Sequence, residues 1–424
     1  MSLELWLDRT ARERPDAPAV DGMSYRELDG AAASCAAALA AKGVNPGDRV
    51  ATTLSGRAFA VLMHALAKLG AVLVPVNTRL TGNERDALLA DAKPRLVVEQ
   101  LPAATRTLSG DRPENLRHAD PDAPFAVVYT SGTAGAPKPV ELTYGNFAAS
   151  AEANAENLGV DPDDRWLCCM PLFHVGGLSI LTRSAIYGTT AVLHDRFDVA
   201  DVRDALDNER ITLVSLVATQ LRRLLDDGLA NPPHLRAALI GGGPVPRDLL
   251  QRAAERGIPA LPTYGMTETC SQIWTGDKAL PGVEMRTAAD GEILVRGPMV
   301  APGAMAADGW LHTGDRGQID SDGALHVEGR IADTIVTGGE NVAAAEVEEA
   351  LLSHPAVRDA AVVGREDPEW GQAVVAYVVG DVPDAELIEH ARGRLAGFKV
   401  PKAIHHVPEI PRNAAGKILR GRLA

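Results

Sequence analysis

A run of hydroxyl residues, glycines and one lysine at residues 129–140 is the strongest chemical signal in the chain. It reads Tyr-Thr-Ser-Gly-Thr-Ala-Gly-Ala-Pro-Lys-Pro-Val, and the apolar stretch 126–130 at its start is typical of a strand. Glycines let the backbone approach an anion closely, hydroxyls donate hydrogen bonds, and the lysine adds a positive charge. We therefore predict a phosphate-binding loop after a strand, with these residues at the phosphates: Thr130, Ser131, Gly132, Thr133, Gly135 and Lys138.

Two better-known nucleotide-binding patterns are excluded. The run lacks the Gly-Lys-Ser/Thr sequence of the P-loop in kinases and GTPases. No Gly-x-Gly-x-x-Gly follows an early strand, which argues against a dinucleotide-dependent oxidoreductase. A flexible surface turn is the plainer interpretation, but such a turn does not need three hydroxyls interleaved with glycines and a lysine.

The run resembles the signature loop of the adenylate-forming superfamily, which includes acyl- and aryl-CoA ligases, peptide-synthetase adenylation domains and beetle luciferases. Further motifs follow in the order of that superfamily, so that the resemblance covers nearly the whole chain: Gly241–Pro246, Tyr264–Thr269, Trp310–Asp315, Gly329–Asp333 and Asn413–Lys417. A Thr-Glu pair alone is a weak signal, whereas the same pair inside Tyr-Gly-x-Thr-Glu is specific.

This resemblance implies where the nucleotide binds. Thr267 would contact phosphate, Glu268 would bind Mg²⁺, and Asp315 would hold both ribose hydroxyls. Arg330 would lie near the ribose and phosphate, and Lys417 would be the lysine of the adenylation step. The remaining positions around the adenine and nucleotide would be Gly241, Gly242, Gly243, Pro244, Tyr264, Gly265 and Met266.

The chemistry of such an enzyme explains these residue types. A carboxylate is a weak nucleophile, and the α-phosphate of ATP that it attacks is itself negative, so positive charge and in-line positioning are needed. The substrate carboxylate is the nucleophile, pyrophosphate leaves, and the thiolate of coenzyme A then attacks the acyl-adenylate. ATP, Mg²⁺ and coenzyme A are therefore the implied cofactor and co-substrates.

The resemblance also implies a domain organisation. We expect a large N-terminal domain of layered α/β sheets with a small β-rich subdomain, residues 1–329, and a small mobile α+β domain, residues 330–424. In the superfamily the C-terminal domain rotates between the half-reactions, here about a hinge at Ala332. The rotation would withdraw Lys417 and present Gly338, Gly339 and Glu340 to a pantetheine channel.

Three shorter sequence segments indicate the acid substrate. The segments PLFHVGGLSIL, IYG and YGMTETCSQI resemble those of o-succinylbenzoate–CoA ligase of menaquinone biosynthesis. Its substrate keeps an aryl carboxylate while the aliphatic one is activated, and Arg183 could pair with the retained group. A surface arginine on a helix is the competing interpretation. The acyl-pocket positions implied are His174, Gly177, Arg183, Thr269, Ser271 and Gln272. His174, as a bare residue, is more often a packed histidine.

The chain departs from the superfamily pattern at three positions. Ala134 stands where Ser or Thr is usual, Pro139 replaces a glycine, and Ala332 replaces the usual Asp or Lys of the hinge. A weakly active or non-catalytic adenylate-binding homologue is therefore one alternative. A general aryl- or fatty acyl-CoA synthetase is the nearest alternative, and an adenylation domain that loads a carrier protein is another.

The elements that must position these residues can be read from periodicity. Ser24–Glu27 and Thr81–Glu84 are capping boxes that open helices. Apolar strands recur as far as residue 264, and this pattern suits a parallel sheet covered on both faces. The expected strands are 71–76, 126–130, 190–193, 213–217 and 237–240. After residue 330 we expect helices at 344–353 and 385–395 and strands at 360–363 and 374–379.

Composition narrows the class of protein. The chain has 424 residues, 46% of them hydrophobic, and a formal net charge of −14. This length implies at least two domains, and the acidity argues against binding of nucleic acid. The four cysteines form neither a disulfide framework nor a zinc pattern. Because no signal peptide or membrane-spanning stretch is evident, we expect a cytoplasmic protein without membrane association, and a homodimer is a family-level expectation.

Overall fold

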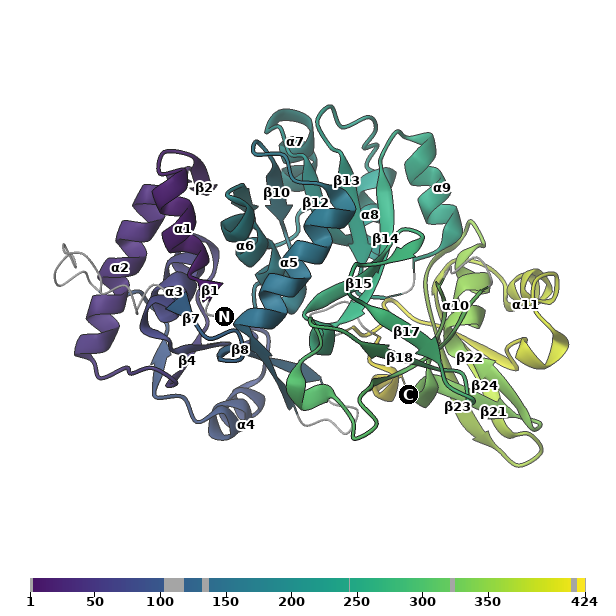
Figure 1. Ribbon diagram of the computed structural model, residues 1–424. Coiled ribbons are helices and arrows are strands. Elements are labelled where there is room, and N and C mark those ends of the chain that lie inside the picture. Colours follow the sequence, from purple (N-terminus) through teal and green to yellow (C-terminus); the bar gives the residue numbers. More distant parts are fainter. Residues whose placement is uncertain are drawn as a thin grey trace. The chain divides into compact units, whose positions relative to one another are not determined.

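The computed structural model describes residues 3–102, 118–131, 137–243, 245–320, 325–412 and 418–423. The chain divides into two compact units, shown in Figure 1. Unit 1 comprises Met1–Gly241, Ala253–Val283 and Arg296–Gly309, and unit 2 comprises Gly242–Arg252, Glu284–Val295 and Trp310–Ala424. Most of the predicted β-rich subdomain thus belongs to the same unit as the C-terminal residues. The predicted boundary near residue 330 separates the part expected to rotate from the part expected to stay fixed, and it stays a prediction.

The larger sheet of unit 1 is mostly parallel. Strands β14, β13, β12, β10, β11 and β2 pair in parallel, and antiparallel strands flank them. Among the described residues the order is β16 (Lys278–Ala279), β15 (Ser271–Thr275), β14 (Ala260–Met266), β13 (Ala237–Gly241), β12 (Leu213–Val217), β10 (Arg165–Cys168), β11 (Thr190–Leu193), β2 (Pro18–Val20) and β3 (Met23–Ser24). Parallel strands carry ligands at their carboxyl ends, and this sheet directs several predicted site residues there.

A second sheet of unit 1 carries the Gly/Ser/Thr run. Its order is β6 (Leu96–Val98), β4 (Arg49–Thr52), β5 (Val72–Pro75), β8 (Pro124–Ser131) and β9 (Pro137–Thr143). Strands β8 and β9 form an antiparallel hairpin, with Thr130 opposite Lys138 and Tyr129 opposite Pro139. The short pair β1 (Leu3–Glu4) and β7 (His118–Ala119) stands apart.

Helices pack between and around these sheets. Helix α5 contacts strands of both, as Figure 1 shows in blue-teal. Its N-terminus is fixed by Thr143, whose hydroxyl accepts from Asn146 N at 3.1 Å. The helices beginning in unit 1 are α1 (Trp6–Glu13), α2 (Tyr25–Ala41), α3 (Gly56–Leu69), α4 (Gly82–Ala92), α5 (Tyr144–Leu158), α6 (Val175–Tyr187), α7 (Val199–Asn208) and α8 (Ala218–Asp226). Helix α9 (Arg247–Glu255) spans the division between the units.

Unit 2 contains two sheets. One is the antiparallel meander β17 (Glu284–Thr287), β18 (Glu292–Arg296), β19 (Leu311–Ile319) and β20 (Leu325–Arg330). The other runs β22 (Glu340–Ala343), β21 (Thr334–Thr337), β24 (Gly371–Gly380) and β23 (Val357–Asp367), and β25 (Ala403–His406) pairs with β24. Its helices are α10 (Ala344–Leu352) and α11 (Asp384–Arg392), and Arg420–Arg422 form a 3₁₀ turn.

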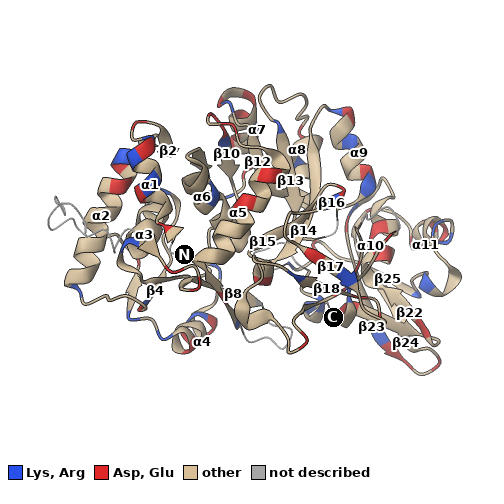
Figure 2. Cartoon of the chain, in the orientation of Figure 1, with Lys and Arg blue, Asp and Glu red and all other residues tan. Residues whose placement is uncertain are grey.

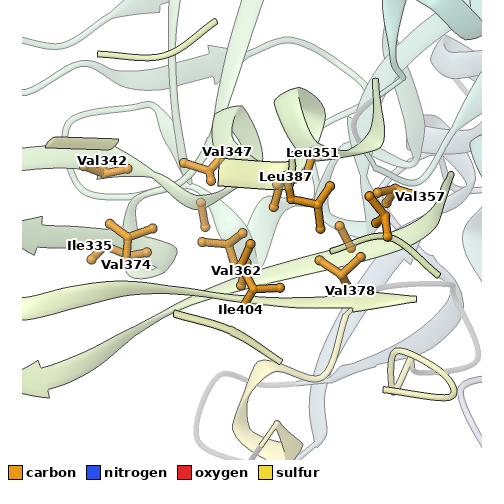
Figure 3. Packing of buried hydrophobic residues seen from close by; sticks show 14 residues of the cluster. Ile335, Val342, Val347, Leu351, Val357, Val362, Val374, Val378, Leu387 and Ile404 are labelled. Carbon is orange, nitrogen blue, oxygen red and sulfur yellow. The ribbon is translucent and has the colours of Figure 1, made fainter. Parts of the chain in front are cut away.

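The core of unit 2 lies between these helices and the second sheet. In Figure 3, Val347 and Leu351 of α10 and Leu387 of α11 lie against the strand residues Val362 and Val378. All five residues are fully buried, with 0% relative exposure. One face of α10 is therefore fixed by apolar packing, and its other face is available for polar contacts.

Most predicted elements are confirmed, with shifted ends. Both capping boxes are present: Ser24 N donates to Glu27 at 2.8 Å and Thr81 N donates to Glu84 at 2.8 Å. The strands predicted at 190–193 and 213–217 have those bounds. The residues predicted as loop after 130 include an edge strand, β9, and edge strands are where proline is tolerated.

The cysteines, the helix lengths and the distribution of charge describe the physical character of the chain. All four cysteines are free and buried. Among the described helices, none has both the length and the apolar character needed to cross a membrane. Figure 2 shows acidic and basic residues interspersed along helices α4 and α9. Mixed charge of this kind is typical of solvated helix faces.

Candidate active site

The β8–β9 hairpin presents the first part of the predicted phosphate loop. The hydroxyl of Thr130 donates to the carbonyl of Lys138 at 3.3 Å, across the hairpin. Lys138 is exposed. The strand β8 ends at Ser131, and Gly132, Thr133, Ala134 and Gly135 lie outside the described residues, as do Pro244 and Lys417. The described part therefore supplies an exposed cation beside a hydroxyl.

The carboxyl ends of β13 and β14 carry the predicted adenine and nucleotide residues. Gly241 is the last residue of β13, and Tyr264, Gly265 and Met266 end β14. A Cβ atom on Gly265 would collide with the backbone of Ser271 and Gln272, because β14 and β15 approach closely there. Only glycine fits this position, which explains the second residue of the Tyr-Gly-x-Thr-Glu motif.

The residues after β13 are open to solvent. Gly242 has φ +80°, a left-handed conformation that favours glycine, and both Gly242 and Gly243 are exposed. A Cβ atom on Gly243 would meet no atom within 4 Å. The backbone of Gly242 and Gly243 is therefore not covered by side chains of its own.

Thr267 and Glu268 lie in a strained turn that other residues hold in place. The turn runs from Thr267 to Thr269, and Cys270 and Ser271 then have φ of +51° and +98°. Left-handed backbone is costly outside glycine and persists only where surrounding contacts impose it. Here the Cys270 carbonyl accepts from Ser150 Oγ at 3.1 Å and the Glu268 carbonyl accepts from Ala301 N at 2.8 Å.

Thr269 completes the turn. Its hydroxyl accepts from Met266 N at 2.9 Å and lies 2.7 Å from the Ser271 carbonyl. The residues from Ser271 form strand β15, so Thr269, Ser271 and Gln272 do not cap a following helix. The side chain of Thr269 is therefore a brace for the turn, and Ser271 and Gln272 begin a strand.

His174 precedes α6 and is largely enclosed. It is the residue before the first turn but makes no side-chain cap, and its Nε2 is buried without a hydrogen-bond partner among the described residues. Burial, aided by the positive charge of Arg79, lowers the pKa of His174 to about 4. The imidazole is thus neutral at pH 7, with one ring nitrogen able to donate to or accept from a bound molecule. Gly177 sits one turn on, where a Cβ would press on Met170 O at 3.0 Å.

Arg183 lies wholly inside unit 1 and is not the surface arginine of the competing interpretation. It is 2% exposed. Its Nη2 donates to Ser150 Oγ at 2.9 Å, and its Nη1 lies 3.5 Å from Gln272 Oε1. The guanidinium carbon lies 5.7 Å from the centroid of the Trp166 ring, within range of a cation–π contact.

No carboxylate pairs with Arg183 among the residues that the structure describes. Its Nε has no hydrogen-bond partner there, and burial lowers the pKa of its guanidinium. Even so, arginine remains protonated in proteins, so a cation stands in this interior with neutral neighbours. A buried charge of this kind needs a counter-charge, and a substrate anion can supply one.

Sequence reasoning missed two neighbours of Arg183. Ser150 of α5 joins Arg183 to the strained turn, since its hydroxyl contacts both Arg183 and the Cys270 carbonyl. Trp166 of β10 lies against the guanidinium. Neither belongs to a recognised motif, and both read as ordinary core positions, so no signal in the sequence singles them out. Ser179 and Ser271, in turn, place their hydroxyls 3.4 Å apart.

In unit 2, strands β19 and β20 bring Asp315 and Arg330 together. The two residues are register partners, and Arg330 Nε lies 2.8 Å from Asp315 Oδ1. A second donor, Arg330 Nη1, contacts the Thr313 carbonyl at 2.8 Å. The side chain of Asp315 is 8% exposed and that of Arg330 is 40% exposed. The arginine thus orients a buried carboxylate and remains partly open to solvent.

The predicted channel residues form a tight hairpin. Gly338 and Gly339 connect β21 to β22, with Thr337 opposite Glu340. Their φ values, +58° and +84°, are those of a type I′ turn, for which glycine is favoured. Ala332 lies in the 3₁₀ turn Ile331–Asp333, at the junction between the two sheets of unit 2.

Glu268 fits a Mg²⁺ ion that ATP carries in. No group of three or more His, Cys, Asp or Glu side chains among the described residues could hold a metal alone. Mg²⁺ is commonly bound by one or two carboxylates together with substrate phosphates and water. Glu268 is half-buried next to Thr267, and no described side chain pairs with its carboxylate. The donor set therefore suits a metal that arrives with nucleotide.

The chain matches characterised proteins along nearly its whole length. A 2-succinylbenzoate–CoA ligase of Bacillus velezensis is 39% identical over 99% of this chain and 97% of its own length, and one of Bacillus cytotoxicus is 38% identical with the same coverage. Among solved structures, the o-succinylbenzoate CoA synthetase MenE of Bacillus subtilis with ATP and magnesium superposes with a TM-score of 0.93. It is 36% identical, covering 100% of both chains.

More distant structures share the fold. MatB of Rhodopseudomonas palustris, bound to ATP, has a TM-score of 0.90 at 28% identity, covering 99% of this chain and 98% of its own. The AMP-binding enzyme family matches residues 7–304, and the AMP-binding enzyme C-terminal domain matches residues 346–417. The ordered motifs, the fold and these matches agree, and the chain belongs to the AMP-binding enzyme family.

Proposed function

We propose that this protein is an ATP-dependent ligase that joins o-succinylbenzoate to coenzyme A through an acyl-adenylate. Its relatives over the full length are 2-succinylbenzoate–CoA ligases, and MenE of Bacillus subtilis has been solved with the acyl-adenylate of o-succinylbenzoate. The observation that carries the choice of acid is the buried guanidinium of Arg183, which has no carboxylate partner among the described residues.

The buried cation separates the candidate acids. o-Succinylbenzoate has two carboxylates, one of which is activated and one of which keeps its charge. The retained aryl carboxylate would pair with Arg183 and satisfy its open Nε donor, whereas a fatty acid or a simple aryl acid would leave the cation unpaired. A general aryl- or fatty acyl-CoA synthetase is therefore less well supported.

The remaining pocket positions fit the same substrate. Gln272 and Ser150 hold Arg183, and Ser271 lies beside Ser179 on the same side of α6. His174, neutral at pH 7 because of its burial, would offer a hydrogen bond to the uncharged part of the acyl group. Gly177 allows the first turn of α6 to approach the backbone at Met170.

The nucleotide positions serve charge neutralisation. Lys138 and the hydroxyl of Thr130 would face the phosphates, Thr267 would donate to the α-phosphate, and Glu268 would hold Mg²⁺. The metal, when bound, reduces the negative charge on the phosphates that the carboxylate must approach. In unit 2, Asp315 would accept from both ribose hydroxyls while Arg330 keeps its carboxylate oriented. No side-chain nucleophile is required.

Lys417 and the hairpin at Gly338 would act in different half-reactions. Lys417 would stabilise the α-phosphate during adenylation. A rotation of residues 330–424 about Ala332 would then withdraw it and bring Gly338, Gly339 and Glu340 to the pantetheine arm of coenzyme A. The left-handed glycines at the hairpin tip leave no side chain there to obstruct a thin, extended ligand.

Two further assignments follow from the same proposal. A reaction that uses ATP and coenzyme A belongs in the cytoplasm, and a homodimer is the assembly that family membership favours. Ala134 and Pro139 lower the expected rate without removing a charged group, and Ala332 does so by replacing the charged residue that is usual at the hinge.

The decisive experiment measures pyrophosphate release over a panel of carboxylic acids, with and without coenzyme A. We expect release with o-succinylbenzoate, and a thioester product when coenzyme A is present. A flat profile, or a preference for fatty acids, would contradict the choice of acid. No release with any acid would favour an adenylate-binding protein without catalysis.

A further inference from the structure

Arg420, close to the end of the described chain, joins three separate elements of unit 2. Its Nη2 lies 2.6 Å from Glu348 Oε1 on α10, and its Nη1 lies 3.2 Å from Asp333 Oδ2. Its Nε donates to the carbonyl of Val362 on β23 at 3.1 Å. The side chain is only 20% exposed, so the C-terminal turn is held through all three arms of one guanidinium.

The buried carboxylate of Glu348 requires its contact with Arg420. It is 7% exposed and also accepts from Val362 N at 2.8 Å. Burial raises the pKa of Glu348 to about 7, and Arg420 opposes that rise. Neutralising a carboxylate at this depth is a role that a buried arginine fulfils and a solvent-exposed residue cannot.

The rest of the tail is tied at a second point. Arg412 pairs with Asp359 of β23 at 2.7 Å, and Arg412 bridges Ile418 in antiparallel fashion. Leu419 N donates to the Pro411 carbonyl at 2.8 Å. Residues 413–417 lie outside the described part, but the residues on both sides of them are anchored to the same sheet.

The other end of the Arg420 contact lies next to the proposed hinge. Asp333 closes the 3₁₀ turn that contains Ala332, and its side chain is 29% exposed. Glu348 belongs to α10, which Val347 and Leu351 fix in the apolar core that Figure 3 shows. Arg420 therefore connects a rigid helix, the hinge turn and the C-terminal tail.

We infer that Arg420 is a positioning residue for adenylation: by binding Asp333 and Glu348 together, it fixes the tail that carries Lys417 relative to the hinge. This inference rests on the proposed role of Lys417. The tail must move with the hinge turn if a rotation is to deliver and withdraw one lysine reproducibly. Arginine suits the position because its planar fork reaches three acceptors at once, which the single ammonium of lysine does not.

The test compares the two half-reactions in variants that loosen this contact. Asp333→Ala removes one acceptor at a partly exposed position and leaves Glu348 paired. Arg420→Lys retains the charge beside Glu348 but loses the fork. We expect both variants to lower the rate of acyl-adenylate formation about 10-fold or more, because misplacement by about 1 Å can cost up to 100-fold. Thioester formation from supplied acyl-adenylate should change less than about 3-fold.

The matched control is Asp384→Ala. It removes another side-chain contact of an aspartate in the same unit, that of Asp384 with His406 at 2.8 Å, which does not involve the tail. Both half-reactions should be unaffected. Thermal unfolding of all variants shows whether the unit stays folded.

A double-mutant cycle with Lys417→Ala separates positioning from a general structural role. If Asp333 acts through the lysine, Asp333→Ala causes no further loss of adenylation in the Lys417→Ala background. Additive losses, equal losses in both half-reactions, or wild-type adenylation in both Asp333→Ala and Arg420→Lys would overturn the inference. If Lys417→Ala itself leaves adenylation intact, it is the proposed role of Lys417 that fails.

Discussion

The two arginines of the predicted site stand in opposite circumstances. Arg330 in unit 2 is 40% exposed at its side chain and pairs with the buried carboxylate of Asp315. Arg183 in unit 1 is 2% exposed and has neutral partners among the described residues. The first arginine is satisfied within the protein, so its carboxylate partner is held ready for neutral hydroxyls. The second is left unsatisfied, so it is suited to an anion from outside.

The difference shows what to look for in a specificity site. Burying a cation without a counter-charge is costly, and proteins generally avoid it unless a ligand supplies the missing charge. In the proposed function, the pair Asp315–Arg330 would serve the nucleotide, whereas Arg183 would serve the choice of acid. If this distinction holds, changes at the two arginine sites must affect different substrates.

The largest expected effect comes from Arg183→Met, which keeps much of the side-chain volume without the charge. We expect kcat/KM for o-succinylbenzoate to fall about 1000-fold, since a polar site rejects mismatched partners by factors of this order or more. The measurement is pyrophosphate release with o-succinylbenzoate and with 4-oxo-4-phenylbutanoate, which lacks the aryl carboxylate.

The second acid is the internal control for this variant. Arg183→Met should use it at least as well as the wild type does, because the variant has no buried cation that this acid would leave without a partner. A parallel loss with both acids would mean that Arg183 serves the fold and not the choice of substrate.

Asp315→Asn should produce a smaller and less selective effect. The amide keeps the shape but removes the charge that, in the proposed function, would accept from the ribose hydroxyls, and a hydrogen bond to a charged group contributes about 1.5–3 kcal/mol. We expect KM for ATP to rise by about 10- to 100-fold, equally for both acids. If KM for ATP changed by different factors with the two acids, the proposed division of roles between the two arginine sites would be contradicted.

The sequence indicated which residues of both regions to consider but not their electrostatic state. Motif order pointed to Asp315 and Arg330, the resemblance of shorter segments pointed to Arg183, and capping boxes and apolar periodicity located α2, α4 and the parallel strands. Burial of Arg183 could not be read from its sequence neighbours, because it depends on α5 and β15 closing over α6. Its contacts with Ser150 and Gln272 span 33 and 89 residues. Likewise, Pro139 reads as a loop residue until the pairing of β8 with β9 is seen.

His174, another buried titratable group of unit 1, tests whether burial determines its protonation state. The pKa of His174 is lowered to about 4, so the folded protein binds fewer protons than the unfolded chain between pH 6.5 and 4. The stability due to neutral, buried His174 is therefore fully present above pH 6.5 and is lost as the pH falls towards 4. We expect His174→Asn to remove about 1–2 kcal/mol of the loss between pH 7.5 and 5, measured by urea unfolding.

His64 provides the control for that measurement, because it is also buried and its pKa is lowered to about 3. It remains in the variant and should preserve the rest of the pH dependence. Identical pH profiles for wild type and His174→Asn would mean that His174 titrates normally.

The smallest expected effect concerns Pro139, where the family usually has glycine. Pro139 lies in the edge strand β9 opposite Tyr129, and an edge position tolerates the missing N–H. We expect Pro139→Gly to change KM for ATP less than about 3-fold and to lower the free energy of unfolding by at most about 1 kcal/mol, because glycine makes the unfolded chain more flexible. Calorimetry and ATP titration of pyrophosphate release measure both. A large gain in ATP affinity would show that the proline, and not only the charges of the site, limits nucleotide binding in this chain.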